Sequence, residues 1–548
     1  MIEVELKLQV PPGALAAVAA EVGTGAPSQR LQAFYFDTAE RHLAAAGLAL
    51  RLRKEGRRWL QTLKSGAAHA MQRGEHNAAV AAVPGLAVPP LDLSRHAGTA
   101  VGPALDAVLA KAGGSPLRVQ YRTDVRRRSR TLRSRRGSVE LALDVGHIEA
   151  NPPGADQPLR WPVCELEVEL LGGSPLAVID VARRLARRHD LWLDTRSKAE
   201  RGDRLARGLA ADAPVAAVRA SPLELRAAPA APPSAPQSRA KQGSLSPDKT
   251  ARHSKAEPTA AAARRAVLHN VLAHALPNWN EVAAGQASPE SLHQLRVALR
   301  RLRSAERLFE GMLGLAPAER SEPAAALFRA LGASRDRDAL AGGLQADVDA
   351  ALACLGEAPL ALGALPEAAP WSDRERASLG LVWFDLLAES LAEPGPEERP
   401  GAAGAAEAEA PEFAQALAER LGRWHGQVRR DAKRFLLLDD TARHRLRKRL
   451  KRLRYGVEFA ASLFKKRAVS RYLERLRAAQ EKLGEYNDLA VAQSAYASAA
   501  TAARAAGADG EPRAWFALGW LAERRTRLLE ECAAELLRFR EAKAFWRT

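Results

Sequence analysis

Residues 2–8 read Ile-Glu-Val-Glu-Leu-Lys-Leu, a strict alternation of apolar and charged side chains that decides how the first part of the chain folds. Successive side chains of a β-strand point to opposite faces, so Glu3, Glu5 and Lys7 fall on one face and the apolar residues on the other. The stretch therefore predicts a strand with one apolar face and one face that presents two acids and a lysine.

The same alternation returns in later segments of residues 1–212, which Gly- and Pro-containing turns separate. The charged members of these segments are Arg51, Arg53, Glu140, Asp144, Glu165, Glu167 and Glu169. Period-two segments broken by turns predict a mainly β domain. A solvated sheet face with Glu and Lys paired across strands explains one such strand, but the recurrence favours a closed barrel with its charges inside.

A cavity lined by both cations and carboxylates suits a multiply phosphorylated anion. Arg binds phosphate oxygens through two parallel hydrogen bonds, and Lys supplies a compact charge. Carboxylates alone would repel such a ligand, so their presence calls for a hard divalent ion, Mg²⁺ or Mn²⁺, between carboxylate and phosphate oxygens. The ion would also polarise the terminal phosphoryl group.

A series of motifs in fixed order gives this β domain a family resemblance. The motifs are EVELK (3–7), YFDT (35–38), GLALRLR (47–53), LQTLK (60–64), YRTD (121–124), LALDVG (141–146), CELEVEL (164–170) and SKAERG (197–202). Together they resemble the CYTH superfamily of triphosphate tunnel enzymes. The resemblance implies an eight-stranded antiparallel β-barrel that hydrolyses a triphosphate with a divalent metal.

The resemblance also implies roles for individual residues. The phosphate-binding residues would be Lys7, Arg51, Arg53, Lys64, Arg122 or Arg126, Lys198 and Arg201. The metal-side carboxylates would be Glu3, Glu5, Asp144 and Glu165 or Glu167. The catalytic candidates are Glu5 and Lys64, and Lys64 would have to lose its proton to activate the water. Arg122 and Arg126 share a face, so the sequence does not choose between them.

The composition of the whole chain agrees with a polyanionic partner. The 548 residues carry 82 Lys and Arg against 64 Asp and Glu, a net charge of +18, and at about 150 residues per domain they predict several packing units. Three cysteines without metal-ligand or pairing spacing indicate reduced thiols, and no secretion signal or apolar run of membrane-spanning length is found. We therefore expect a cytoplasmic protein without a membrane span.

Residues 213–258 are rich in Ala, Pro, Ser, Gln and Lys and predict a disordered linker, so the domains on either side are expected to move semi-independently. Residues 259–548 carry Leu, Ala, Arg and Glu at three- and four-residue spacing and predict an all-α bundle. His444 follows His293 by 151 residues (444 − 293), and similar sequences surround both. The bundle is therefore predicted to be a duplication, with copies at about 259–392 and 412–548.

Each copy contains a helix with basic residues along one stripe. The stripe residues are His293, Arg296, Arg300, Arg303 and Arg307 in the first copy and His444, Arg447, Lys451 and Arg454 in the second. Lys448, Arg301, Arg449 and Arg452 lie beside these stripes and either widen a groove or only solubilise the helices. Crowded like charges destabilise a helix, so their repetition favours a bound anion over a solvated Arg-rich face.

These helices resemble the CHAD domain, which implies a two-lobed bundle that binds inorganic polyphosphate in a basic groove. The combined prediction is metal-dependent hydrolysis of tripolyphosphate to pyrophosphate and phosphate, with the helical domain targeting the enzyme to polyphosphate, including polyphosphate granules. The alternatives are a non-catalytic polyphosphate-binding protein, a thiamine triphosphatase and an adenylate cyclase. Few aromatic residues accompany the basic stripes, which disfavours nucleic acid as the partner.

Overall fold

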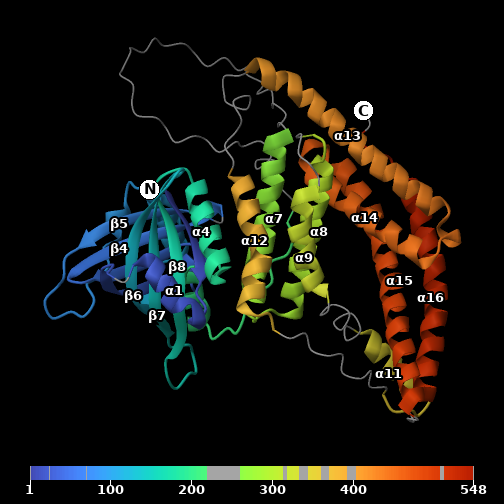
Figure 1. Ribbon diagram of the computed structural model, residues 1–548, viewed down its shortest axis with the longest axis horizontal. Coiled ribbons are helices and arrows are strands. Elements are labelled where there is room, and N and C mark those ends of the chain that lie inside the picture. Colours follow the sequence, from blue (N-terminus) through green and yellow to red (C-terminus); the bar gives the residue numbers. More distant parts are fainter. Residues whose placement is uncertain are drawn as a thin grey trace.

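The structure is a computed structural model (Figure 1), and it describes most of the two predicted domains. The described residues are 2–23, 25–69, 71–218, 260–312, 318–332, 343–359, 370–391, 403–506 and 511–546. The predicted linker, 213–258, lies outside these residues from position 219 onward.

The first domain is a closed antiparallel β-barrel, as predicted. Its strands are β1 (Ile2–Gln9), β2 (Ser28–Asp37), β3 (Ala49–Glu55), β4 (Arg58–His69), β5 (Gln72–Val80), β6 (Arg118–Ser134), β7 (Gly137–Ala150) and β8 (Leu159–Gly173). They follow the order β5-β4-β3-β2-β6-β7-β8-β1, and pairing of β1 with β5 closes the barrel. The short strand β9 (Trp192–Leu193) pairs with the C-terminal end of β1 at Leu8 and Gln9.

The alternation in β1 separates the inside of the barrel from the outside. Leu6 and Leu8 are buried on the outer side, where they join a core with helices α1 (Leu15–Val22) and α4 (Leu176–His189). The charged residues of the same strand point inward and line the central cavity. One hydrophobic core of this domain therefore lies between the outer surface of the barrel and the helices that cover it. A second core lies on the inner side, where Tyr35 and Tyr121 pack with Leu205.

Three further helices complete the first domain: α2 (His42–Ala45), α3 (Gly102–Lys111) and α5 (Lys198–Ala206). Helix α5 begins with a capping box, in which Ser197 Oγ accepts from the Glu200 amide at 3.1 Å and Glu200 accepts from the Ser197 amide at 2.7 Å. A Cβ atom at Gly202 would lie 2.2 Å from the ring of Tyr121, so only glycine lets α5 approach β6 this closely.

The second domain is helical, as predicted. Its helices are α7 (Ala260–Ala283), α8 (Pro289–Phe309), α9 (Ala318–Ala330), α11 (Leu344–Ala353), α12 (Asp373–Ser390), α13 (Ala403–Lys433), α14 (Asp440–Ala460), α15 (Lys466–Ala506) and α16 (Glu511–Arg540). Helix α13 spans the predicted start of the second copy, at about position 412. Among the helices of the described ranges, none combines the length and the apolar character that crossing a bilayer requires.

The two domains pack against each other over a buried interface, with α4 of the barrel domain beside α12 (Figure 1). Trp279 of α7 is fully buried, and its Nε1 donates to the carbonyl oxygen of Leu193 in β9 at 3.0 Å. Arg183 of α4 pairs with Asp385 of α12 at 2.7 Å. These contacts disfavour the expected semi-independent movement of the domains, which stays a prediction. The composition of the linker carries no information about surface that the two domains bury together.

Candidate functional site

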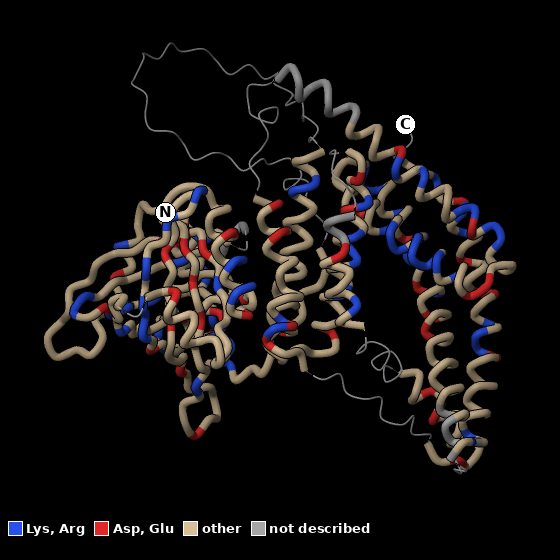
Figure 2. The backbone as a smooth tube through the Cα atoms, in the orientation of Figure 1, with Lys and Arg blue, Asp and Glu red and all other residues tan. Residues whose placement is uncertain are grey.

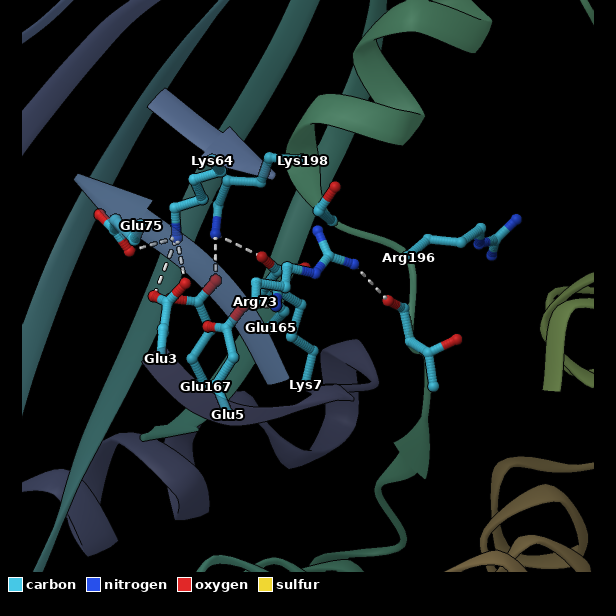
Figure 3. A network of polar contacts seen from close by, with 12 residues as sticks. Glu3, Glu5, Lys7, Lys64, Arg73, Glu75, Glu165, Glu167, Arg196 and Lys198 are labelled. Carbon is cyan, nitrogen blue, oxygen red and sulfur yellow. Dashed lines mark hydrogen bonds and ion pairs between the residues drawn. The ribbon is translucent and has the colours of Figure 1, made fainter. Parts of the chain in front are cut away.

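The interior of the barrel forms a cavity of about 1180 Å³ whose walls carry both signs of charge. The cations that line it are Lys7, Arg51, Arg53, Lys64, Arg73, Arg127, Arg196 and Lys198. The acids are Glu3, Glu5, Glu75, Glu140, Asp144, Glu167, Glu169, Glu200, Asp203 and Asp212. The predicted convergence of acids and bases inside a closed sheet is thus present, and Figure 3 shows its central part.

One carboxylate cluster combines Asp144 of β7 with Glu165 and Glu167 of β8, and an oxygen from each lies within 4.8 Å of the others. Lys198 Nζ, at the start of α5, lies 2.6 Å from Asp144 and 2.8 Å from Glu167, and it also contacts Glu165. Burial opposes ionisation, but Lys198 and Arg127 keep the pKa of Asp144 below its usual value. Asp144 is therefore ionised.

The oxygen-only donors of this cluster fit a hard divalent ion, since Mg²⁺ and Mn²⁺ prefer carboxylate ligands. Two oxygens of Asp144 each accept from Arg127 at 2.7 Å, and Arg201 holds the far oxygen of Glu165. Glu165 is fully buried and Arg201 does not line the cavity. Glu165 and Arg201 thus support the cluster from behind, while Asp144 and Glu167 face the cavity.

A second acidic cluster surrounds Lys64 (Figure 3), whose Nζ lies 2.6 Å from Glu3 and 3.0 Å from Glu75. Burial and the charge of Glu5 raise the pKa of Glu3 to about 7. Lys64 and a hydrogen bond from Glu3 outweigh burial at Glu75 and lower its pKa to about 2. At pH 6, Glu3 is thus mostly protonated while Glu75 is ionised.

Lys64 itself stays charged in this environment. Burial disfavours the ammonium, but attraction by Glu5, Glu3 and Glu75 outweighs it and raises the pKa of Lys64 above its usual value. A raised pKa disfavours the predicted role of Lys64 as a proton acceptor, because a base must be neutral at working pH. That role stays a prediction. Lys64 can act through its positive charge.

The free energy of unfolding should depend on pH because folding raises the pKa of Glu3. Between its usual value of 4.5 and the folded value of about 7, the folded chain holds a proton that the unfolded chain has released, so stability falls as pH rises through this window. Relative to Glu3→Gln, the free energy of unfolding of the wild type should fall by about 3 kcal/mol between pH 5 and pH 8.

Denaturant unfolding with a chelator present measures this change. The control is Glu523→Gln, which alters an exposed side chain of α16. Parallel curves for wild type and Glu3→Gln would contradict the assignment.

Arg51 and Arg53 of β3 also line the cavity. Arg51 donates to the hydroxyl of Tyr35 at 3.2 Å. Burial and the neighbouring Arg51 lower the pKa of Arg53. The Nε atoms of both arginines are buried and have no hydrogen-bond partner within the described part of the chain. Crowded, incompletely satisfied guanidinium groups are suited to an anion with several oxygens.

Strand β6 corrects one prediction. Arg122 and Arg126 are exposed on the outer face of the barrel, where Arg122 pairs with Glu149. Among the arginines of β6, Arg127 lines the cavity, where it pairs with Asp144. No β-bulge shifts these arginines to the other face, since β6 and β7 pair in continuous register here. The prediction chose the wrong face because β6 carries arginine on both of its faces.

Sequence reasoning also missed Arg73 and Glu75 of β5 and Tyr35 of β2. Arg73 pairs with Glu200 at 3.1 Å, and Glu75 completes the cluster around Lys64. Strand β5 lacks apolar alternation, so its inward residues gave no signal. Tyr35 lay within a recognised motif, and its alternation with Ala33 and Leu31 could have assigned it to the cavity.

In the helical domain, the two repeat helices α8 and α14 contact each other, and Lys and Arg recur along both (Figure 2). Arg296 and Arg447 of the predicted stripes are buried: Arg296 donates to the Leu331 carbonyl, and Arg447 lies 3.9 Å from Asp488. They hold helices together. The stripe residues that are exposed or half-buried are His293, Arg300, Arg303, Arg307, His444, Lys451 and Arg454, and Lys448 is exposed beside them.

Besides the two stripes, a cluster of four arginines lies between α8, α13 and α14. Its members are Arg307, Arg420, Arg449 and Arg452. Burial and the charges of Arg307, Arg449 and Arg420 lower the pKa of Arg452 to about 10. The side chain of Arg452 lies over the ring of Trp424 at 4.8 Å. Four cations from three helices therefore converge where the two halves of the domain meet.

Comparisons with known proteins assign a family to each domain. Residues 1–202 match the CYTH domain, and residues 266–497 match the CHAD domain. The crystal structure of the CHAD domain from the plant Ricinus communis is 28% identical with a TM-score of 0.38, covering 52% of this chain and 93% of that one. An adenylyl cyclase candidate from Hippeastrum, described as having a dominant triphosphatase activity, is 18% identical with a TM-score of 0.25, covering 38% of this chain and 96% of that one.

Proposed function

Since the chain consists of a CYTH domain followed by a CHAD domain, we propose that it is a metal-dependent inorganic triphosphatase whose helical domain binds inorganic polyphosphate. CYTH domains generally act on phosphoanhydrides. The observation that supports this proposal most directly is the cavity in which Arg51, Arg53 and Lys7 face buried carboxylates. A ligand that combines phosphate oxygens with a divalent cation can interact favourably with both groups at once.

The residues have separate tasks in this proposal. Arg51, Arg53 and Arg127 bind the phosphate oxygens, while Asp144 and Glu167, supported by Glu165, hold Mg²⁺ or Mn²⁺. Glu3 and Glu5 are the candidates for a further carboxylate contribution on the β1 side. When bound, the ion would draw negative charge from the terminal phosphoryl group. Lys64 and Lys198 stabilise the charge that develops on the oxygens during in-line attack by water.

One observation favours a second candidate, an organic triphosphate. The cavity extends past the barrel to Leu272, Leu276 and Pro277 of α7, an apolar surface that a nucleoside or thiamine group could contact and a bare phosphate chain could not. The inorganic substrate is preferred because the chain also carries a domain with a basic cluster for phosphate polymers.

A substrate panel tests the proposal. The purified full-length protein is incubated with tripolyphosphate, ATP, thiamine triphosphate and long-chain polyphosphate, with Mg²⁺, with Mn²⁺ and with a chelator, and released phosphate is measured. We expect tripolyphosphate to be cleaved fastest and the chelator to abolish cleavage. Preference for ATP or thiamine triphosphate would select the organic candidate. Binding of these compounds without phosphate release would make the chain a binding protein.

The arginine cluster predicts how the helical domain binds long polyphosphate. Arg307→Gln should weaken binding and reduce the slope of log K against log salt by about one, because one fewer cation displaces counterions from the polymer. Fluorescence anisotropy with labelled polyphosphate at several salt concentrations measures both quantities. Arg527→Gln, which removes a 71% exposed arginine from α16, is the matched control. Equal slopes for Arg307→Gln and wild type would remove this cluster from the binding site.

A further inference from the structure

Helix α7 belongs to the helical domain, yet it lines the cavity of the barrel. The α7 residues that reach the cavity are His269, Leu272, Ala273, Leu276, Pro277 and Asn280. They lie close to the segment that precedes α5, since Asn280 forms hydrogen bonds with Thr195 and both residues line the cavity. One wall of the candidate active site is therefore built by the second domain.

The contact between α7 and the barrel centres on the segment that precedes α5. Asn280 Oδ1 accepts from the Thr195 amide at 3.1 Å, and Asn280 Nδ2 donates to Thr195 Oγ1 at 2.8 Å. Glu281 accepts from Arg196 Nη1 at 2.7 Å and from Arg204 Nη1 at 2.9 Å. Asn280 and Glu281 are each 2% exposed, so water does not compete for these bonds.

The same segment connects directly to the charged centre of the cavity. The amide of Asp194 donates to the carbonyl oxygen of Lys7 at 3.1 Å, and both oxygens of Asp194 accept from Arg196. Lys198 follows two residues after Arg196 and carries the ammonium that three carboxylates share. The backbone position of residues 194–198 thus determines where this ammonium lies.

We propose that Asn280 and Glu281 of the helical domain are positioning residues of the tunnel, which fix residues 194–198 and thereby place Lys198 for catalysis. This rests on the proposed function for its kinetic consequences and goes beyond it, because the helical domain becomes part of the catalytic unit in addition to binding polymer. Displacing a catalytic group by about 1 Å reduces rates up to about 100-fold. Within the described part of the barrel domain, residues 194–196 form hydrogen bonds with their neighbours and with Lys7, Gln9 and Arg73.

The test uses the full-length chain with Asn280→Ala, Asn280→Asp and Thr195→Val. For tripolyphosphate, Asn280→Ala should lower kcat about tenfold and change KM by less than about twofold, because Arg51 and Arg53 still bind the phosphates. Asn280→Asp keeps the acceptor for the Thr195 amide and should recover part of kcat. Asn280→Ala combined with Thr195→Val should be no slower than Asn280→Ala alone, since Asn280→Ala already removes the bond to Thr195 Oγ1 that Thr195→Val removes.

Asp385→Asn is the matched control, because it breaks the ion pair with Arg183 in the same domain interface without touching residues 194–198. Its kcat should stay within about twofold of wild type. Hydrogen exchange provides a readout that needs no turnover: in Asn280→Ala, residues 194–198 should exchange faster while residues 165–169 of β8 do not. Unchanged exchange and unchanged kcat in Asn280→Ala, or an equal loss in Asp385→Asn, would overturn the proposal. A wild type that releases no phosphate, with the expected exchange pattern, would refute the proposed function and leave the positioning role supported.

Discussion

Arg127→Ala is expected to reduce kcat/KM for tripolyphosphate by about 100-fold to 1000-fold, the range found when a preorganised donor to developing negative charge is removed. Arg127 lines the cavity, binds both oxygens of Asp144 at 2.7 Å and also contacts Glu167. Its loss would remove a phosphate ligand and leave two carboxylates with one cation fewer.

Arg122→Ala is the control, since it makes the same change on the same strand with a side chain that is 55% exposed outside the barrel. Its kcat/KM should stay within about twofold of wild type. Arg127→Lys should fall between the two, because a lysine keeps the charge and loses the paired geometry. Steady-state phosphate release, with melting temperatures to confirm folding, measures all three. A larger loss in Arg122→Ala than in Arg127→Ala would restore the assignment made from sequence.

Lys198→Met is expected to lower the free energy of unfolding by about 3–5 kcal/mol at neutral pH, the range observed when one partner of a buried charge cluster is removed. Asp144 and Glu165 are fully buried, and they share the ammonium of Lys198 with Glu167. The loss should shrink toward pH 4, because protonation of one carboxylate then relieves the repulsion. Activity with tripolyphosphate should be lost as well.

Lys448→Met provides the comparison, as it makes the same replacement at an exposed position of α14. It should change the unfolding free energy by less than about 0.5 kcal/mol. Denaturant unfolding of both variants from pH 4 to pH 8, with a chelator present, gives the two curves. If Lys198→Met were as stable as Lys448→Met at pH 7, the ammonium would not be what neutralises this cluster.

The fold could be predicted because its two signals were strong. Strict alternation in β1 separates apolar from charged faces, and the three- and four-residue spacing in α8 and α14 does the same for helices. That Glu3 and Lys7 share one face of β1 followed from period two, and the recurrence of the pattern in other strands favoured placing that face inside the barrel. In β6 the reasoning failed, because Arg122, Arg126 and Arg127 place arginine on both faces and only the closed barrel decides which is inside.

The contact between the domains could not be predicted for a different reason. Asn280 and Glu281 are polar residues on a helix, and the sequence offers no sign that they are buried. Their partners, Thr195 and Arg196, lie in a loop 85 positions earlier in the chain. Burial of polar groups depends on the partners that tertiary structure supplies, and these partners are not visible in local patterns.

Because the apolar side chains of β1, β7 and β8 pack outward against α1 and α4 while their charged neighbours line the lumen, the folding of these strands does not require that the charged part of the lumen be filled. A lumen walled by charges holds solvent and ions without the dry void that an apolar barrel would leave. Substitutions in the charged part of the lumen are then limited by the balance of charge and not by the volume of the side chains. Replacements inside should be tolerated when an acid and a base change together, whereas replacements on the outside, beneath α4, should be tolerated according to size.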